Sequence, residues 1–326
     1  MRAIVITEPG SAEVLEEEER PIPEPRASQI RVRVKTSGLN RADLLQRRGM
    51  YPPPNGAPAD IPGLEYAGEV EAVGPGAGLW AVGSRVMGIV GGGSYAEFLC
   101  VHEREAIRIP HGLDWDDAAA IPEAFLTAYD ALFRQMDLEA SERVLIHAVG
   151  SGVGTAAVQL ARAFGAITYG TSRTPEKLDA AKKLGLQHGF DASDDDWVEK
   201  AKAATDGEGI NVVLDLVGGH YVPLNLRLLA PRGRAIIVGT IAGSRAEVDF
   251  RVVMQKRLRI AGTVLRSRPL EEKIQLAREF SDSVLPLFSS GQLRPVIDRV
   301  YPFAEVVEAH RAMEENRSFG KIVLKW

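Results

Sequence analysis

Residues 144–165 are VLIHAVGSGVGTAAVQLARAFG, and this stretch decides the fold. A short β-branched apolar run predicts a buried strand, and small and apolar residues at helical spacing follow the glycines. Strand, glycine turn and helix in this order form the context of a dinucleotide fingerprint, here G-x-G-x-x-A from Gly152. Gly152 and Gly154 let the backbone approach a pyrophosphate, and the helix start at Val153 supplies unpaired N–H groups. Ser151 either binds the cofactor or only tolerates the turn, and glycines also punctuate ordinary turns.

The residues after the next strand bear on which dinucleotide binds. The run 166–171 predicts that strand, and its end lies about 20 residues past the glycines, where the ribose is recognised. An NAD-specific site carries Asp or Glu there, whereas this chain has Ser172 and Arg173, with Lys177 one turn into the following helix. Two cations and no carboxylate favour the 2′-phosphate of NADPH. The alternative is that Arg173 and Lys177 are only solvated surface charges.

The composition is that of an ordinary globular protein large enough for two domains. The chain has 326 residues, of which 45% are hydrophobic and 25% charged, and its formal net charge is −5. This acidic balance argues against broad binding to nucleic acid or anionic membranes. Cys100 is the only cysteine, which excludes an intramolecular disulfide and a cysteine-built metal site.

The beginning of the chain already predicts a strand. Residues 1–8, MRAIVITE, are followed by acids and lack the pattern of a signal peptide. No apolar run is long enough to span a membrane. We therefore expect a cytoplasmic protein without a membrane partner.

The first third of the chain predicts a β-rich domain. Strands are expected at 1–8, 29–36, 65–73, 82–90, 96–101 and 106–109, where apolar or alternating runs are separated by turn residues. One helix is expected over 41–48, with Asn40 as its N-cap. The prolines of 51–58 make a stiff loop, either a plain connector or part of a site. Several short strands and few helices favour a partly closed β-domain.

From residue 114 onward the pattern changes to alternating strands and helices. After helices at 116–120 and 123–134, strands are expected from 144, from 166, and over 210–216, 234–239 and 258–265, with helices over 175–184, 197–204 and 222–229. This alternation predicts a doubly wound parallel sheet with right-handed crossovers. The tail predicts a helix from 269 to 288, a strand at 296–301, a helix over 303–316 and a strand at 321–325. It has no place in the parallel sheet, so we expect it to return to the first domain.

With these residues in view, the chain resembles the medium-chain dehydrogenase/reductase superfamily, and within it the zinc-free quinone oxidoreductases related to ζ-crystallin. The matching segments cover essentially the whole chain in order: 37–43 (SGLNRAD), 62–68 (PGLEYAG), 118–129, 147–159, 215–219 (DLVGG) and 320–324 (GKIVL). Residues 151–157 and 265–268 are most similar to the p53-inducible quinone oxidoreductase branch. The resemblance implies an α/β fold with a partly closed, β-rich GroES-like catalytic domain over 1–121 and 267–326. It also implies a doubly wound parallel Rossmann sheet that binds NADP over 122–266.

The chain departs from the zinc-dependent relatives at their ligand positions. Asn40 stands where those relatives carry a cysteine ligand, and Leu64 where they carry a histidine ligand. A catalytic zinc takes about three protein ligands plus an open position. One cysteine also cannot build the four-cysteine lobe of their structural zinc. We therefore expect no metal.

The resemblance implies that Asn40, Asp43, Tyr51 and Thr127 surround the cleft that receives the nicotinamide. In that arrangement the Asn40 amide donates a hydrogen bond to a substrate oxygen, and Thr127 or Tyr51 adds a hydroxyl. Solvent or Tyr51 supplies the proton. The plainer roles are a helix cap for Asn40, an orienting or structural group for Asp43, and packing over the proline loop for Tyr51.

The same resemblance extends the set of cofactor-binding residues. Gly239, Ile241 and the Leu265–Arg266 region are expected near the nicotinamide, and Asn316 near the cofactor. Many quinone oxidoreductases carry a tyrosine after the third strand that helps to hold the adenosine phosphate, whereas this chain has Ala192 there. For Glu65, His147 and His188 we expect a satisfied structural role rather than a role as a base.

Together these features predict NADPH-dependent, metal-free reduction of quinones by hydride transfer, because an electron-poor acceptor needs little help from the protein. One alternative is an alkenal or enone reductase of the same fold. Another is a nucleotide-dependent protein that mainly binds RNA or a partner, against which the acidic balance argues. We expect a small-molecule quinone or enone as substrate, no nucleic acid, and a homodimer formed by edge pairing of the nucleotide sheet near 260–265.

Overall fold

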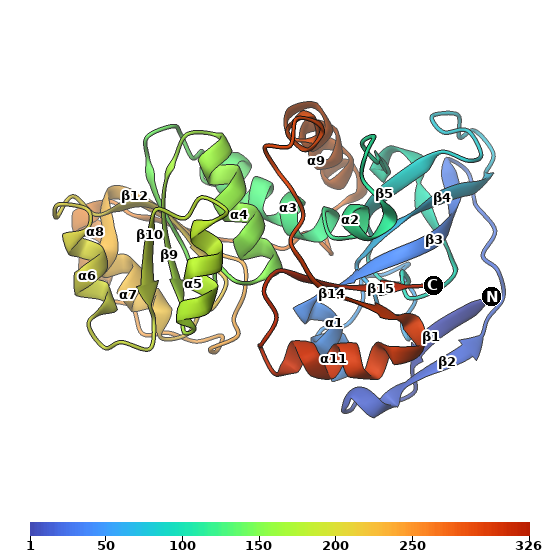
Figure 1. The fold of residues 1–326 in the computed structure, drawn as a ribbon, viewed down its shortest axis with the longest axis horizontal. Coiled ribbons are helices and arrows are strands. Elements are labelled where there is room, and N and C mark those ends of the chain that lie inside the picture. The colour runs from blue at the N-terminus through green and yellow to red at the C-terminus, as the bar shows by residue number, and fades with distance from the viewer. The chain divides into compact units, whose positions relative to one another are not determined.

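The computed structural model describes all 326 residues and divides into two compact units. Unit 1 consists of Met1–Leu126 and Leu265–Trp326, and unit 2 consists of Thr127–Val264. The borders drawn from the sequence after residues 121 and 266 make the nucleotide unit somewhat longer than this division does. The fold is mixed α/β, with one β-rich unit and one unit built on a parallel sheet (Figure 1).

Unit 1 is built on a seven-stranded sheet in the order β14-β15-β3-β4-β5-β7, with β6 paired to β3, and on a two-stranded sheet of β1 and β2. Its strands are β1 (Arg2–Ile6), β2 (Leu15–Glu19), β3 (Gln29–Leu39), β4 (Glu65–Val73), β5 (Arg85–Ile89), β6 (Phe98–His102), β7 (Ile107–Arg108), β14 (Ile297–Pro302) and β15 (Lys321–Lys325). Its helices are α1 (Arg41–Arg47), α2 (Trp115–Ala119), α3 (Pro122–Tyr129, which crosses the border), α9 (Leu270–Ser283), α10 (Leu285–Ser289) and α11 (Val306–Glu314). Short 3₁₀ turns occupy Ala12–Val14, Glu103–Glu105 and Phe303–Glu305.

The last strand of the chain completes the sheet of unit 1. Strand β15 pairs parallel with β14 and antiparallel with β3, with Ile322 opposite Leu39 and Leu324 opposite Ser37. The start of β15 therefore lies beside the end of β3, directly before Asn40. Residues of β3 and β4 that face inward, such as Ile30, Val32 and Val70, are fully buried, as the alternating pattern predicts.

Unit 2 holds a six-stranded parallel sheet in the order β10-β9-β8-β11-β12-β13. The strands are β8 (Arg143–Ile146), β9 (Ile167–Ser172), β10 (His188–Asp191), β11 (Ile210–Asp215), β12 (Leu229–Ile237) and β13 (Arg259–Gly262). The helices are a π-helical turn at Asp130–Gln135, α4 (Gly152–Ala163), α5 (Pro175–Lys182), α6 (Trp197–Ala203), α7 (Tyr221–Leu228) and α8 (Phe250–Lys256). Helices α4 and α5 cover one face of the sheet, and α6, α7 and α8 cover the other (Figure 1). This is the doubly wound arrangement that the sequence predicts.

Three elements were not predicted, and several were predicted too long, among them the strand expected at 82–90, where β5 covers Arg85–Ile89, and the strand expected at 258–265, where β13 covers Arg259–Gly262. Strands β2 and β10 and helix α8 lie in segments that the pattern left without an element. Strand β10 has only four residues, one of them glycine, so its periodicity is too short to recognise. The helix expected to reach 288 ends at Ser283, and α10 restarts with Pro286 at its second position, where a missing N–H costs little. None of the helices has the length and apolar character required to cross a bilayer.

Candidate active site

The glycine turn of unit 2 joins β8 to α4 at the carboxyl edge of the parallel sheet. Ser151 is the N-cap of α4, and its Oγ accepts the backbone N–H of Gly154 at 3.0 Å. A Cβ on Gly154 would lie 2.3 Å from the carbonyl oxygen of Ala148, so only glycine permits this close packing. The N–H groups of Gly152 and Val153 sit in the first turn of α4, where no intrahelical acceptor exists. These residues fit a pyrophosphate at a helix start.

A buried hydrogen-bond chain connects the strand ends around this turn. His147 Nδ1 lies 2.8 Å from Thr171 Oγ1, and His147 Nε2 lies 2.6 Å from Asn225 Oδ1. Asn225 in turn donates through Nδ2 to Asp215 at 2.9 Å, so its oxygen accepts and His147 Nε2 carries the proton. Burial lowers the pKa of His147 and keeps the ring neutral. His147 therefore ties β8, β9, β11 and α7 together, which is a structural role.

The cations predicted to select NADPH follow β9. Ser172 is buried, and its Oγ accepts the N–H of Thr174 at 3.1 Å, whereas Arg173 is exposed. Lys177, on the first turn of α5, lies against the glycine turn, since a Cβ on Gly150 would lie 2.7 Å from Lys177 Cδ. Both cations thus stand at the carboxyl edge of the sheet, where a 2′-phosphate would be recognised.

Two further predicted cofactor residues follow β12. A Cβ on Gly239 would lie 2.6 Å from the carbonyl oxygen of Leu216, so the loops after β11 and β12 approach closely there. Ile241, on the loop after β12, is 62% exposed. An apolar side chain presented at this edge fits the face of a nicotinamide ring.

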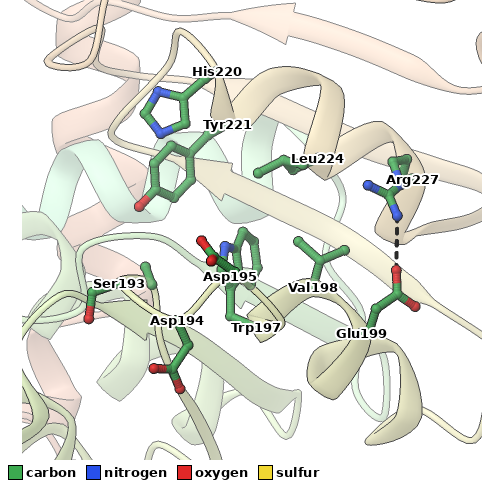
Figure 2. Close-up of a pocket in the computed structure, with 11 residues that line it drawn as sticks. Ser193, Asp194, Asp195, Trp197, Val198, Glu199, His220, Tyr221, Leu224 and Arg227 are labelled. Atoms are coloured by element: carbon green, nitrogen blue, oxygen red, sulfur yellow. Dashed lines mark hydrogen bonds and ion pairs between the residues drawn. The ribbon is translucent and has the colours of Figure 1, made fainter.

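A hollow of about 310 Å³ has Ala192 in its lining, together with residues of α6 and α7 that Figure 2 labels. Its walls include Trp197, His220 and Tyr221, and an ion pair of Arg227 with Glu199 at 2.9 Å closes one side. The acids Asp194, Asp195 and Glu199 line the same hollow. Their negative charge disfavours a phosphate, so we do not expect the phosphate groups of the cofactor to bind in this hollow.

The centre of the candidate site in unit 1 is a cluster of the buried Glu65 and Lys321 with the partly buried Asn40. Lys321 Nζ donates to Glu65 Oε1 at 2.5 Å, to Asn40 Oδ1 at 2.6 Å and to the Leu39 carbonyl at 3.0 Å. Asn40 Nδ2 donates to Glu65 Oε1 at 2.8 Å and to the Gly38 carbonyl at 3.2 Å. All three N–H bonds of the ammonium and both of the amide are therefore used inside the protein.

Glycine at position 38 is required by this cluster. A Cβ there would lie 2.1 Å from Glu65 Oε1 and 2.8 Å from the Ala119 carbonyl. The second oxygen of Glu65 accepts the backbone N–H of Glu123 at 2.7 Å and so anchors the start of α3. Glu65 has the satisfied structural surroundings that we expected of it.

Asp43 lies next to this cluster in the first turn of α1. Its Oδ2 accepts the N–H of Asn40 at 2.8 Å, its Oδ1 accepts the N–H of Gly63 at 3.0 Å, and the hydroxyl of Tyr95 lies 3.4 Å away. Burial raises the pKa of Asp43 to about 6 although both backbone N–H groups oppose this shift. The carboxylate thus orients the loop that carries Asn40 rather than facing outward.

Tyr51, on the proline loop, is held by Arg266. The guanidinium donates to the Tyr51 carbonyl at 3.1 Å, to the Gly91 carbonyl at 2.7 Å and to Gln46 Oε1 at 2.5 Å. It also lies 4.9 Å from the centre of the Tyr51 ring, within the range of a cation–π contact. Burial raises the pKa of the Tyr51 hydroxyl, which Arg266 partly offsets. The proline loop is therefore fastened to α1 and to the glycine loop at 91–93.

The remaining predicted residues are divided between the units. Thr127 is buried on α3 and is the first residue of unit 2. Leu265 is also buried, but it belongs to unit 1, as does Asn316, whose Oδ1 accepts from Arg41 at 2.6 Å. The structure thus collects Asn40, Asp43 and Tyr51 in one unit and the glycine turn with its cations in the other.

Sequence reasoning assigned no role to Lys321 or Glu123. It placed the Leu265–Arg266 region near the nicotinamide but did not predict that Arg266 binds the proline loop. Lys321 lies in the closing GKIVL segment, and only the register of β15 against β3 shows that it reaches Asn40. No group of three or more His, Cys, Asp or Glu side chains in the structure could hold a metal ion.

Comparison with known proteins identifies the class to which this fold and site belong. Residues 26–111 match the family model described as alcohol dehydrogenase GroES-like domain, and residues 152–282 match the model described as zinc-binding dehydrogenase. The chain is 33% identical to the quinone oxidoreductase of Pseudomonas aeruginosa over 97% of its own length and 96% of that protein. The chain therefore belongs to the medium-chain dehydrogenase/reductase superfamily, and within it to the quinone oxidoreductase group.

Solved structures agree with this assignment. The Escherichia coli quinone oxidoreductase complexed with NADPH superposes with a TM-score of 0.89 at 29% identity, and all of both chains is covered. The CurK enoyl reductase gives a TM-score of 0.87 at 29% identity and covers 99% of this chain and 98% of its own. The chain also matches 5% of the length of the polyketide synthase GfsB of Streptomyces halstedii, at 37% identity. The protein is an oxidoreductase of a superfamily that uses a nicotinamide cofactor.

Proposed function

We propose that this protein reduces quinones with NADPH by hydride transfer and without a metal. The observation that carries the proposal is the cluster of Lys321, Glu65 and Asn40. Asn40 stands where zinc-dependent relatives carry a cysteine ligand, and here its amide oxygen accepts from an ammonium group at 2.6 Å. The same ammonium group pairs with Glu65 Oε1 at 2.5 Å, so the carboxylate beside Asn40 already has a cation as its partner.

The choice of substrate follows from what these residues offer. A bound NADPH supplies the hydride, and the protein positions the acceptor beside it. The chain offers no strong Lewis acid, so the acceptor must already be electron-poor, as quinones and enones are. Both N–H bonds of the Asn40 amide are engaged by Glu65 and Gly38, so we assign Asn40 the role of positioning its loop. The hydroxyls of Tyr51 and Thr127 are then the groups that contact the substrate oxygen.

The preference for NADPH rests on charge at the carboxyl edge of unit 2. Arg173 and Lys177 follow β9, and no carboxylate stands at the ribose position to repel a 2′-phosphate. The Escherichia coli relative was solved as a complex with NADPH. We assign Ser151, Gly152, Val153 and Gly154 to the pyrophosphate.

Enone reduction is the second candidate, because two of the structural neighbours are the CurK and JamJ enoyl reductases. Both reactions deliver hydride to a conjugated acceptor, and they differ in the atom attacked. Comparing kcat/KM for 1,2-naphthoquinone with that for an α,β-unsaturated aldehyde separates them.

The decisive experiment is steady-state oxidation of NADPH and of NADH with 1,2-naphthoquinone, before and after treatment with a chelator. We expect turnover that survives the chelator and favours NADPH. Loss of activity on chelation would contradict the metal-free assignment, and equal use of NADH would reduce Arg173 and Lys177 to surface charges. Activity with the enone but not with the quinone would favour enone reduction as the function.

We further propose that two copies pair through the edge of the sheet in unit 2. Strand β13 is the outer strand, and Ile260 on it is 40% exposed. On α8, Phe250 is 70% and Met254 68% exposed. An unpaired strand edge with exposed apolar side chains invites a second copy of the chain.

A further inference from the structure

We propose that Glu123 is the catalytic acid that protonates the reduced acceptor, an inference that rests on the reduction proposed above. Glu123 is the second residue of α3, within unit 1. In this assignment the acceptor receives its proton from Glu123 and not from Tyr51 or directly from solvent.

The backbone of Glu123 is fixed to the buried cluster. Its N–H donates to Glu65 Oε2 at 2.7 Å, while the other oxygen of Glu65 binds Lys321 and Asn40. Thr127 follows four residues later on the same helix, and residues at this spacing share one helix face. Glu123 therefore lies at the start of the helix that also carries Thr127, and its backbone is fixed to the cluster.

The carboxyl group of Glu123 is available for chemistry. Its side chain makes no hydrogen bond or ion pair with the protein, and the residue is only partly exposed. Four charged groups face it: Glu65 on β4, Asp43 on α1, Lys321 on β15 and Arg266 after β13. Burial first, and then the negative charge of Glu65, outweigh the two cations and raise the pKa of Glu123 to about 8.

The neighbouring acids are poorer donors at neutral pH. Asp43 has a pKa of about 6 and both of its oxygens accept backbone N–H groups. The Tyr51 phenol has a pKa raised above its ordinary value, so it releases a proton reluctantly. A general acid works best when its pKa lies near the working pH. Of Glu123, Asp43 and Tyr51, only Glu123 has a pKa near neutrality and is still protonated there.

The proton balance of the reaction requires one such group. A quinone that gains a hydride carries two electrons and one hydrogen, and it needs one more proton to become the hydroquinone. In the proposed step the O–H bond of Glu123 breaks and an O–H bond forms at the negatively charged quinone oxygen. Glu123 is left as a carboxylate next to Glu65. Being partly exposed, it regains its proton from solvent.

The first test is an infrared pH titration of the full-length, cofactor-free protein. A protonated carboxyl gives a carbonyl band that a carboxylate lacks. In the wild type we expect a band of Glu123 that disappears with an apparent pKa of about 8. A band of Asp43 should disappear separately, with a pKa of about 6. The Glu123 band should be absent from Glu123→Gln and unchanged in Glu272→Gln, an exposed glutamate on α9 that serves as the matched control. Persistence of the band in E123Q would overturn the proposal.

The second test is the pH dependence of kcat with 1,2-naphthoquinone and saturating NADPH. A donor must be protonated, so kcat of the wild type and E272Q should fall as the pH rises above about 8. In E123Q we expect kcat lowered about 10²-fold, an unchanged KM for NADPH and no such limb. A limb that survives in E123Q, or an undiminished kcat, would overturn the role of Glu123. A wild type that reduces neither quinones nor enones would instead refute the proposed function, while the infrared band still reports whether Glu123 holds its proton.

Discussion

The ammonium group of Lys321 lies 2.5 Å from Oε1 of Glu65, and both side chains are buried. The two residues are 256 positions apart in the chain. They meet because β15 pairs with β3, which also pairs with β4, where Glu65 is the first residue. The same carboxylate anchors the start of α3 through the N–H of Glu123. One ion pair thus fixes the ends of two strands and the start of a helix in unit 1.

Removing one partner of this pair should destabilise unit 1 strongly. Lys321→Met leaves the Glu65 carboxylate buried without its cation, and we expect unfolding free energy to fall by about 3–5 kcal/mol. Glu65→Gln should cost a similar amount, because the ammonium is then unpaired. The double variant should recover part of the loss, since no uncompensated charge remains buried. Denaturant unfolding of the three variants closes a double-mutant cycle and measures the coupling.

Lys325→Met is the control for this cycle. Lys325 lies on the same strand, but its side chain is 51% exposed and pairs with Asp116 at 3.1 Å. An exposed pair contributes about 0–1 kcal/mol. Equal losses for K321M and K325M would show that the buried cluster does not hold unit 1 together.

His310 should make the protein sensitive to acid. It is fully buried on α11, with Arg47 Nη1 at 3.1 Å from its Nδ1. Burial, and then the charge of Arg47, lower the pKa of His310 to about 3, whereas an unfolded histidine titrates near about 6.5. The stability due to the neutral ring is therefore complete above pH ~6.5 and is lost as the pH falls toward ~3, by about 1.4 kcal/mol per pH unit.

Melting temperatures of His310→Gln between pH 7 and pH 4 measure this loss. The variant should lose less stability on acidification than the wild type, because glutamine binds no proton. Some loss should remain, since burial also lowers the pKa of His147 in unit 2. His111→Gln, at an exposed position, should follow the wild-type curve. Parallel curves for H310Q and the wild type would contradict the assignment.

Elements with strong local signals could be predicted from the sequence. Strands β4 and β15 have the predicted bounds, because glycine or proline punctuates apolar runs of ordinary length. The glycine turn and α4 follow from one contiguous motif. Strand β10 and helix α8 were missed because the first has four residues and the second only seven, of which none is fully buried, so neither shows a clear period.

The candidate site could be predicted only where a residue acts locally. Asn40 and Asp43 were proposed as site residues because helix α1 begins there and because the segment resembles a known family. The partners that define their surroundings, Glu65 and Lys321, lie on strands whose register no periodicity reveals. For the same reason the prediction did not distinguish Leu265 from Arg266, whereas Leu265 is buried and Arg266 holds Tyr51.

Arg173 should contribute to the preference for NADPH. It is exposed at the end of β9, and we propose that it pairs with the 2′-phosphate, which NADH lacks. Arg173→Ala should raise KM for NADPH about tenfold, equivalent to about 1.4 kcal/mol, and leave KM for NADH unchanged. The NADPH effect should shrink at high salt, because exposed charges are screened. Lys183→Ala, an exposed lysine at the end of α5, is the matched control, and a uniform change for both cofactors would contradict the pairing.

Ile260 should be essential for pairing of two copies. It lies on the edge strand β13 and is 40% exposed, and the helix that precedes this strand in the chain, α8, carries the exposed Phe250 and Met254. Ile260→Lys places a charge that two paired edges would have to bury together, so we expect sedimentation to show a monomer with an unchanged circular dichroism spectrum. Ile22→Lys makes the same substitution at an isoleucine of unit 1 that is 47% exposed, and it should leave the oligomer intact. A wild type that sediments as a monomer would contradict the pairing itself, whereas an I260K oligomer would place the contact on another surface.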